Sequence, residues 1–559
     1  MNRVTAVLSS AALAFSLSAG SALAADLLVL AEDVPAGLDY DGASIAIPAT
    51  QTGVDNLLEP LIYYKEKGLN DEGVMTHDFT QFEGRLAESW TFDEPTLTWT
   101  FKLRQDVKGC NGATFDADDV MYTFARAKTV SGAAPIGWFL SSVGSVDNFT
   151  PAVFGDSPEA KAAQKLGDEV QKVDNYTVKI RQSAPNALFQ HVLTIFGLYI
   201  FDKETMEANS TTADPWSHQY TDNVNAPGFG AYCLSNWEKD KEFAVVANPD
   251  YYRGKPHFDR VILRKVPQSS NRVVILRSGQ AGLIERVTPK EFNSLRGVSG
   301  VKVAGVLGNE NLFVHMNFKT PPFDNPKVRQ AIAHAIPYDA IIRDAYFGGA
   351  KKWVGSIPTS YTDYHEPSTT YDEDLDKARA LLAEAGYPEG KGLEKFPGAF
   401  NMAYVTEKES ALGPVANLIR TNLAKIGIDV KLDPLPQTTY GDRQLVKKDL
   451  PFALNDQEKP IAPDAAYGLF LFFVSAEKGG LNTMVNYSNV VVDALYAAAL
   501  NEGDPARRTA QLAEAQEILA KDVAWLPVLE WKTQWAFSDK IKGIKWHADN
   551  SIRWYDLSE

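Results

Sequence analysis

The side chains that enzymes use for catalysis form no recognisable arrangement along this chain of 559 residues. Its eight histidines are scattered without the short spacing that metal ligands require. The sequence contains no His-Glu-x-x-His, no Gly-x-Ser-x-Gly and no Gly-x-x-x-x-Gly-Lys motif, which excludes the common metalloprotease, serine-hydrolase and phosphate-binding signatures. We therefore expect no catalytic residues, no metal site and no cofactor, and we do not expect an enzyme.

Two cysteines, Cys110 and Cys233, are the remaining reactive side chains. In an oxidising compartment such a pair is a candidate disulfide, and the bond would close a long loop. Two buried free thiols are the alternative. Whether the two cysteines form a disulfide therefore depends on whether the protein resides in an oxidising compartment.

The first residues predict that compartment. Arg3 precedes a largely apolar stretch over residues 4–17, and Ala22-Leu23-Ala24 forms a small-x-small cleavage site, the pattern of a cleavable secretory signal peptide. No later stretch approaches the roughly 20 apolar residues of a membrane span, so we expect a soluble mature protein in the periplasm. The net charge of −16 and the pI near 5.1 make nucleic acid a poor partner.

The elements that would position functional side chains are clearest between residues 97 and 128. Apolar and polar residues alternate over 97–104, which predicts a strand with one buried face. The glycines and asparagine of 109–112 predict a turn, because these residues tolerate left-handed backbone angles. Asp116 is then placed to cap a helix, and Asp119 lies near the positive end of the helix dipole.

Three stretches resemble the family 5 solute-binding proteins of ABC importers, which include dipeptide- and oligopeptide-binding proteins. They are Trp99-Thr-Phe-Lys-Leu-Arg104 with Gly112-Ala-Thr-Phe-Asp116, Pro227-Gly-Phe-Gly-Ala-Tyr232, and Pro321-Pro-Phe-Asp-Asn-Pro-Lys-Val-Arg-Gln-Ala331. The resemblance implies an α/β fold, a two-lobed periplasmic-binding-protein clamshell of type II in its large three-domain variant, with mixed sheets flanked by helices. Cys110-Asn111 departs from the family pattern.

The length predicts two or three domains. A lobe that holds both ends of the mature chain makes the other lobe an insertion, and the crossing segments then act as a hinge. With the resemblance, we predict a signal peptide at 1–24, lobe I at 25–62, 185–284 and 515–559, an accessory domain of lobe I at 63–184, and lobe II at 285–514.

The second lobe is predicted to alternate helices and strands. Asn325 is placed to cap a helix that begins at Pro326, and Asp372 to cap the next one. A further helix over 412–426 ends at Gly427 and is followed by a strand over 428–432.

The resemblance also implies partners and a binding site. A monomer would capture a peptide or similar small solute between its lobes and deliver it to an inner-membrane ABC permease. In peptide-binding relatives, an aspartate followed four residues later by proline takes the α-amino group of the ligand, and Asn455-Asp456 with Pro460 keeps this spacing. The alternative for Asp456 is an exposed loop carboxylate.

Aromatic residues could line the same cleft. Trp531 and Trp535 lie near the predicted lobe junction, whereas Tyr467, Phe470, Phe472 and Phe473 are predicted to be core residues. Aromatic side chains stack on sugars as well as on peptides, so an opine or an oligosaccharide is the alternative ligand. A periplasmic hydrolase or a chaperone-like protein is the alternative class.

Overall fold

A computed structural model describes residues 26–40, 48–128, 136–149, 166–456, 461–478, 480 and 484–559. The predicted signal peptide at 1–24 lies outside these residues. Among the described residues, no helix is both long enough and apolar enough to cross a membrane.

Eleven strands form one large sheet, ordered β15-β14-β16-β12-β17-β11-β1-β10-β9-β8, with β13 paired to β17 outside this order. The strands are β1 (Asp26–Ala31), β8 (Tyr232–Glu238), β9 (Glu242–Ala247), β10 (Arg260–Lys265), β11 (Leu283–Ile284), β12 (Val301–Met316), β13 (Ala350–Lys352), β14 (Asn401–Val405), β15 (Lys431–Leu435), β16 (Phe452–Asn455) and β17 (Leu526–Ser538).

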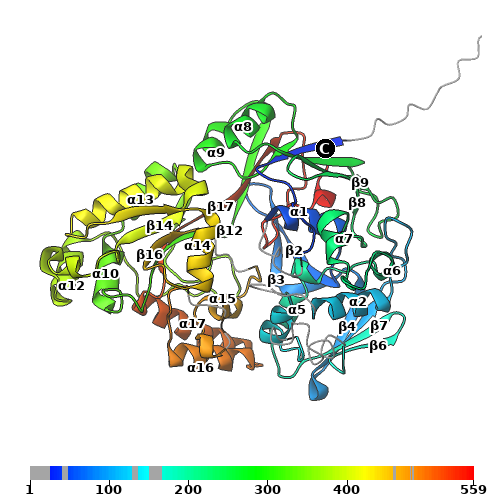
Figure 1. Cartoon of the computed structure of the whole chain (residues 1–559), viewed down its shortest axis with the longest axis horizontal. Helices are drawn as coiled ribbons and strands as arrows, with labels where there is room; N and C mark the ends of the chain where they lie inside the picture. The colour runs from blue at the N-terminus through cyan, green and yellow to red at the C-terminus, as the bar shows by residue number, and fades with distance from the viewer. Residues whose placement is uncertain are drawn as a thin grey trace, which may run out of the picture.

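The antiparallel pair of β12 and β17 joins the two ends of this sheet. One end of the pair lies beside β11, which pairs with β17 at Phe537 and Ala536, and the other end lies beside β16, which pairs with β12 from Phe313 to Met316. Figure 1 shows the rest of the molecule on either side of these strands. We call residues 26–300 and 539–559 the first half and residues 317–525 the second half.

Two small antiparallel sheets complete the first half: β2 (Ile62–Leu69) with β3 (Met75–Gly84), and β4 (Ala87–Asp93), β5 (Thr98–Leu103), β7 (Thr177–Arg181) and β6 (Val170–Asp174) in that order. The predicted strand is confirmed from Thr98. Leu97 does not belong to it, because this residue adopts a left-handed φ of 51° after the short 3-10 helix Glu94–Thr96. Asp116 caps α2 (Ala117–Ala127) in a capping box with Asp119, as predicted.

Helices cover the sheets (Figure 1). Besides α2, those of the first half are α1 (Pro48–Leu57), α3 (Ile136–Trp138), α5 (Phe189–Val192), α6 (Lys203–Ala208), α7 (His218–Asn223), α8 (Ser269–Arg277) and α9 (Pro289–Leu295). Those of the second half are α10 (Pro326–His334), α11 (Tyr338–Ala340), α12 (Leu375–Glu384), α13 (Glu409–Ala424), α14 (Gln437–Gly441), α15 (Ala465–Phe472), α16 (Val490–Leu500) and α17 (Pro505–Asp522).

The predicted helix starts in the second half are right in one case and wrong in another. Asn325 caps α10, and its side chain accepts a hydrogen bond from the Lys327 amide. Asp372 does not cap α12. Asp374 takes that position, and Asp372 instead forms an ion pair with Lys352. After α13 the chain turns at Gly427, and β15 begins at Lys431 rather than at residue 428.

The largest apolar cluster crosses from one half to the other. It contains first-half residues such as Tyr64 and Phe189 together with residues of α15 and α16. The four aromatic residues predicted to be core are buried in this cluster: Tyr467, Phe470, Phe472 and Phe473. A second cluster fills the space between α10, α12, α13 and the second-half strands.

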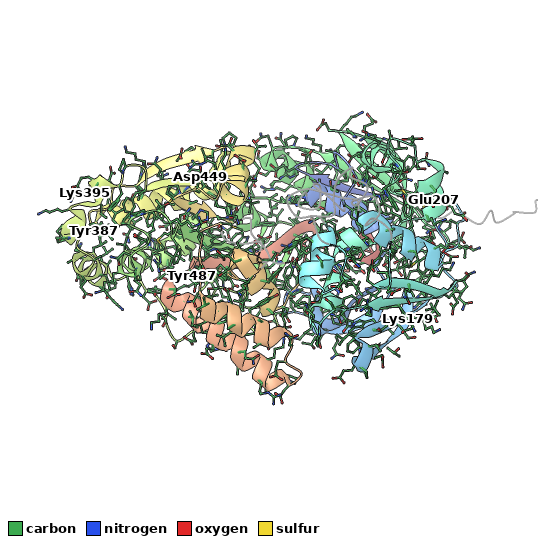
Figure 2. The ribbon with its side chains drawn as sticks, turned by 60° about the horizontal axis from the view of Figure 1, so that its bottom comes forward. Lys179, Glu207, Tyr387, Lys395, Asp449 and Tyr487 are labelled. Atoms are coloured by element: carbon green, nitrogen blue, oxygen red, sulfur yellow. A yellow bond between two sulfur atoms is a disulfide. The ribbon has the colours of Figure 1, made fainter. Side chains whose placement is uncertain are left out.

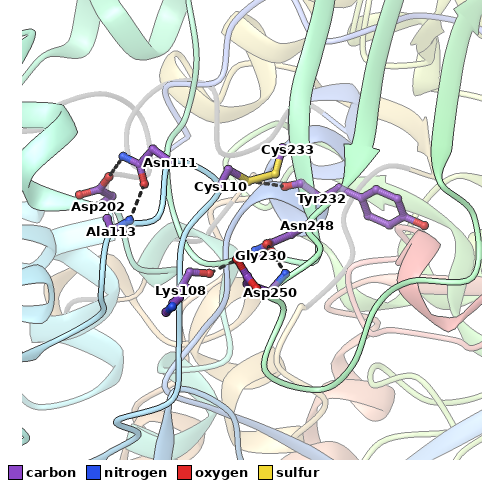
Figure 3. The surroundings of a disulfide bond; sticks show 10 residues. All are labelled: Lys108, Cys110, Asn111, Ala113, Asp202, Gly230, Tyr232, Cys233, Asn248 and Asp250. Carbon is purple, nitrogen blue, oxygen red and sulfur yellow. Dashed lines mark hydrogen bonds between the residues drawn. A yellow bond between two sulfur atoms is a disulfide. The ribbon is translucent and has the colours of Figure 1, made fainter.

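Cys110 and Cys233 are bonded in the structure, with their Cα atoms 5.7 Å apart. The bond attaches the turn after β5 to β8 of the large sheet (Figure 3). Hydrogen bonds on either side hold the same turn, because Asn111 Nδ2 donates to Asp202 at 2.7 Å and Asn248 Nδ2 donates to the Lys108 carbonyl at 3.2 Å. The small sheets are therefore attached covalently to the large one.

Candidate functional site

Two charged side chains meet where β14 and β16 end. These strands are parallel, so their carboxyl ends lie at the same edge of the sheet. Lys408 follows β14 and Asp456 follows β16, and Lys408 Nζ lies 2.7 Å from Asp456 Oδ1. In open α/β sheets, ligands bind outside the carboxyl ends of the strands, so this edge is the first place to look for a site.

The strand β12 reaches the same edge with an irregularity. Its ladder with β17 skips from Leu307, opposite Lys532, to Asn311, opposite Glu530. Gly308, Asn309 and Glu310 therefore form a bulge, which we call the β12 bulge. Bulges re-aim side chains, and this one lies at the middle of the strand pair that joins the two halves.

Residues from both halves contact the β12 bulge. Asn309 Nδ2 donates to the Tyr361 hydroxyl of the second half at 3.0 Å and to the Ala548 carbonyl of the first half at 2.6 Å. Asn550 Nδ2 of the first half donates to Glu310 Oε1 at 3.2 Å. The bulge is thus a junction that holds the C-terminal tail and the 353–364 segment together.

Tyrosines and a tryptophan surround this junction. The rings of Tyr346 and Trp531 lie 5.3 Å apart. Burial raises the pKa of Tyr346 well above its usual value, and the charges of Asp456 and Glu310 raise it further. Burial likewise raises the pKa of Tyr361, to which the Glu310 charge also contributes. Both phenols therefore stay neutral and can serve as hydrogen-bond donors or as aromatic faces for a ligand.

The two halves also contact each other at a second place, where Trp138 of the first half packs against α15 of the second. The ring of Trp138 is stacked on Phe470 of α15 at 5.3 Å, and Phe470 is stacked on Tyr496 at 5.5 Å. The Asp464 charge contributes to the raised pKa of Tyr64, although burial is the main cause. The two halves are therefore in contact in this structure.

The structure brings three of the four predicted site residues to this region. Asn455 ends β16, and Asp456 is only 9% exposed beside it. Trp531 lies on β17 against Tyr346. Trp535 does not join them, because it lies opposite Ala304 and is buried in the largest apolar cluster, which crosses between the halves.

Sequence reasoning missed Lys408, Tyr346 and Glu310. Lys408 and Tyr346 carry no local signal, because only tertiary contacts bring them to the edge of the sheet. Glu310 does have one. Gly308-Asn-Glu-Asn311 interrupts an otherwise apolar strand, and a polar run inside a buried strand indicates a bulge or a functional position.

The sequence as a whole identifies the family. Residues 81–480 match the model of the bacterial extracellular solute-binding proteins, family 5 Middle. The chain belongs to this family. The suspected resemblance is confirmed, and so is the expectation that this family 5 protein is not an enzyme, since its relatives are binding proteins.

Relatives match this family 5 protein over most of their length. It is 26% identical to the probable D,D-dipeptide-binding periplasmic protein DdpA of Escherichia coli, over 87% of this chain and 84% of that one. It is also 26% identical to heme-binding protein A of Haemophilus influenzae, over 83% and 82% of the two chains.

Solved structures confirm the predicted type II periplasmic binding fold. The periplasmic binding protein DppA from Helicobacter pylori, in complex with the peptide STSA, covers 95% of this chain and 98% of its own, with a TM-score of 0.74 and 23% identity. MoaA from A.tumefacien R10, in complex with mannopinic acid, covers 96% and 99%, with a TM-score of 0.72 and 23% identity.

Proposed function

We propose that this family 5 protein is the periplasmic solute-binding component of an ABC importer. It captures a peptide or a similar small solute between its two halves and delivers it, as a monomer, to an inner-membrane permease. The family and the peptide-binding relatives support this proposal. The predicted signal peptide accounts for export to the periplasm.

The structural observation that carries the proposal is that Lys408, Asp456 and the β12 bulge lie together at one edge of the large sheet. A ligand there would touch the second half through Asp456 and Tyr346 and the first half through the groups around Asn550. Contacts from both halves are what capture requires, because a ligand shifts an open-closed equilibrium only by its preference for the closed form.

We propose Asp456 as the contact for the ligand's amino group. Its carboxylate already pairs with Lys408, so a ligand ammonium would share it rather than find it free. The shared arrangement also offers Lys408 Nζ to a ligand carboxylate. A zwitterionic solute with both groups close together fits this pair better than a neutral sugar does.

The experiment is a thermal-shift screen of the mature protein after unfolding and refolding have removed any carried ligand. Pools of dipeptides, tripeptides, longer peptides, opines and oligosaccharides serve as probes, because a ligand raises the Tm in proportion to the logarithm of its concentration over Kd. We expect a shift with peptides. Replacement of Asp456 by alanine should weaken binding by roughly 2 to 5 kcal/mol, since a buried charge would lose its partner.

A matched control is Asp449→Ala, because Asp449 is an exposed carboxylate of the same half that also pairs with a base, Arg443 (Figure 2). The affinity of the Asp449→Ala variant for the peptide should equal that of wild type. A shift with opines alone would favour an opine over a peptide as the ligand and keep the transport function. Turnover of any probe, or promiscuous binding of unfolded chains, would contradict the proposal.

A further inference from the structure

The strand β17 changes partners abruptly where it passes the β12 bulge. Glu530 is held by the second half: Thr359 donates to its carboxylate from the backbone amide and from the hydroxyl, both at 2.8 Å, and Lys351 Nζ lies 3.4 Å away. These contacts replace the water that the Glu530 carboxylate loses on burial, since only 1% of the residue is exposed. Trp531 pairs with Ala350 of β13, so β17 is attached to the second half up to Trp531.

The residues that follow Trp531 are held by the first half instead. Lys532 forms an ion pair with Glu72, which lies in the turn between β2 and β3. The Thr533 hydroxyl donates to Asn550 Oδ1 of the C-terminal tail at 3.2 Å. The attachment of β17 thus passes from one half to the other between two adjacent residues.

The turn between β2 and β3 also binds β12. Asn70 Nδ2 donates to the Gly305 carbonyl at 2.8 Å. The Asn70 side chain is fixed, because its Oδ1 accepts hydrogen bonds from the amides of Glu72 and Val74 within the turn, at 3.0 and 2.9 Å. Figure 1 shows β2 and β3 on the first-half side of β12 and β17. The turn therefore attaches both strands to the first half just before the β12 bulge.

In β12 the change of partners falls at the bulge. The ladder that ends at Leu307 and Lys532 resumes only at Asn311 and Glu530. Between these two stretches of ladder lie the β12 bulge and, on the other strand, Trp531 alone. A bulge leaves residues outside the ladder, so a strand bends there with less loss of pairing than elsewhere.

We infer that the two halves close by pivoting at Trp531 and the β12 bulge, and that Glu72 and Glu530 are positioning residues that confine the bending to this point. The inference rests on the proposed function, which requires the halves to open and close. Glu72 anchors the ladder on the first-half side and Glu530 anchors it on the second-half side. Because the ring of Trp531 lies against Tyr346 in the candidate site, a ligand there would contact the pivot itself.

The test is hydrogen exchange of the ligand-free protein, measured by mass spectrometry. Glu72→Gln should make exchange about threefold faster in the first-half part of the strand pair, residues 301–307 and 532–538, and leave residues 311–316 as in wild type. Glu530→Gln should have the opposite pattern. A wider range of bending can only separate halves that are in contact, so both variants should also give a larger radius of gyration in small-angle scattering.

Glu66→Gln is the matched control. Glu66 lies on the same hairpin but pairs with Lys545 of the C-terminal tail, at 2.7 Å, rather than with β12 or β17. The exchange of the strand pair and the radius of gyration should therefore equal those of wild type in this variant. Circular dichroism melting identifies a folding defect in any variant. Lys532→Met removes the ion pair of Glu72 from the other side and should reproduce the exchange pattern of Glu72→Gln.

Equal acceleration of exchange in both parts of the strand pair, or an unchanged radius of gyration in both variants, would overturn the inference. None of these measurements needs a ligand, so the proposed function is tested separately by the thermal-shift screen. If that screen finds no ligand while the exchange pattern is as expected, the capture of a solute is overturned and the pivot is supported.

Discussion

The bond between Cys110 and Cys233 gives a stability prediction of definite size. The two residues are 123 positions apart in sequence, so removing the bond by Cys110→Ser with Cys233→Ser releases a long loop in the unfolded chain. The chain-entropy relation assigns about 5 kcal/mol to a loop of this length at 25 °C. Most of that free energy should be lost in the double variant.

The size of the protein determines how this loss appears as a melting temperature. For the roughly 535 residues that follow the predicted signal peptide, an unfolding entropy of about 2.1 cal/mol/K per residue sums to about 1.1 kcal/mol/K. The double variant should therefore melt about 4 to 5 °C below wild type if the chain unfolds cooperatively. Scanning calorimetry of both proteins at the same pH and concentration measures this difference.

Two controls make the result interpretable. A reducing agent should lower the Tm of wild type by a similar amount and leave the double variant unchanged. The unreduced protein, unfolded in guanidinium, should contain no titratable thiol. Two titratable thiols, or a Tm that is the same in wild type and the double variant, would refute the reasoning.

Three further changes test other parts of the structure. Burial lowers the pKa of His77 from 6.5 to about 4, so on acidification this histidine binds a proton in the unfolded chain before it does so in the folded protein. The stability of the protein should therefore fall between about pH 6.5 and pH 4. In that range the Tm of His77→Gln should depend less on pH than the Tm of wild type or of the control His257→Gln, in which an exposed histidine is replaced. Phe470→Ala removes the ring stacked on Trp138, so small-angle scattering of the ligand-free protein should give a larger radius of gyration, and an unchanged radius would count against this contact holding the halves together. Asn309→Ala breaks two buried hydrogen bonds of the β12 bulge and should cost about 1 to 3 kcal/mol in urea unfolding, whereas exposed Asn209→Ala should cost much less.

Sequence reasoning was most successful where the signal is local. Asp116 with Asp119 and Asn325 with Pro326 are capping patterns that need no tertiary information, and both are correct. It failed at Asp372, because two aspartates stand near the start of α12 and tertiary pairing with Lys352 decides which one remains for the cap. The predicted lobe boundaries stay predictions, which limited proteolysis would examine.

The candidate site was only partly predictable for the same reason. Asp456 was found through its spacing to Pro460, but its partner Lys408 lies 48 residues earlier in the chain. Trp531 and Trp535 were equivalent in sequence, and only the packing of β17 separates them, since one lies beside Tyr346 and the other enters the core. Residues far apart in sequence acquire a common role through the sheet order alone.

The central position of β12 and β17 has a mechanical consequence. Both connections between the halves are strands of one sheet, paired to each other on either side of the bulge. Relative rotation of the halves must therefore appear as a change of twist in this single two-stranded ribbon. A permease that contacts both halves would then respond to one quantity, the angle between the halves, rather than to several independent loop positions. If the proposed site takes a ligand, its occupancy would be converted into a single mechanical coordinate, which two labels placed far from the ligand could follow.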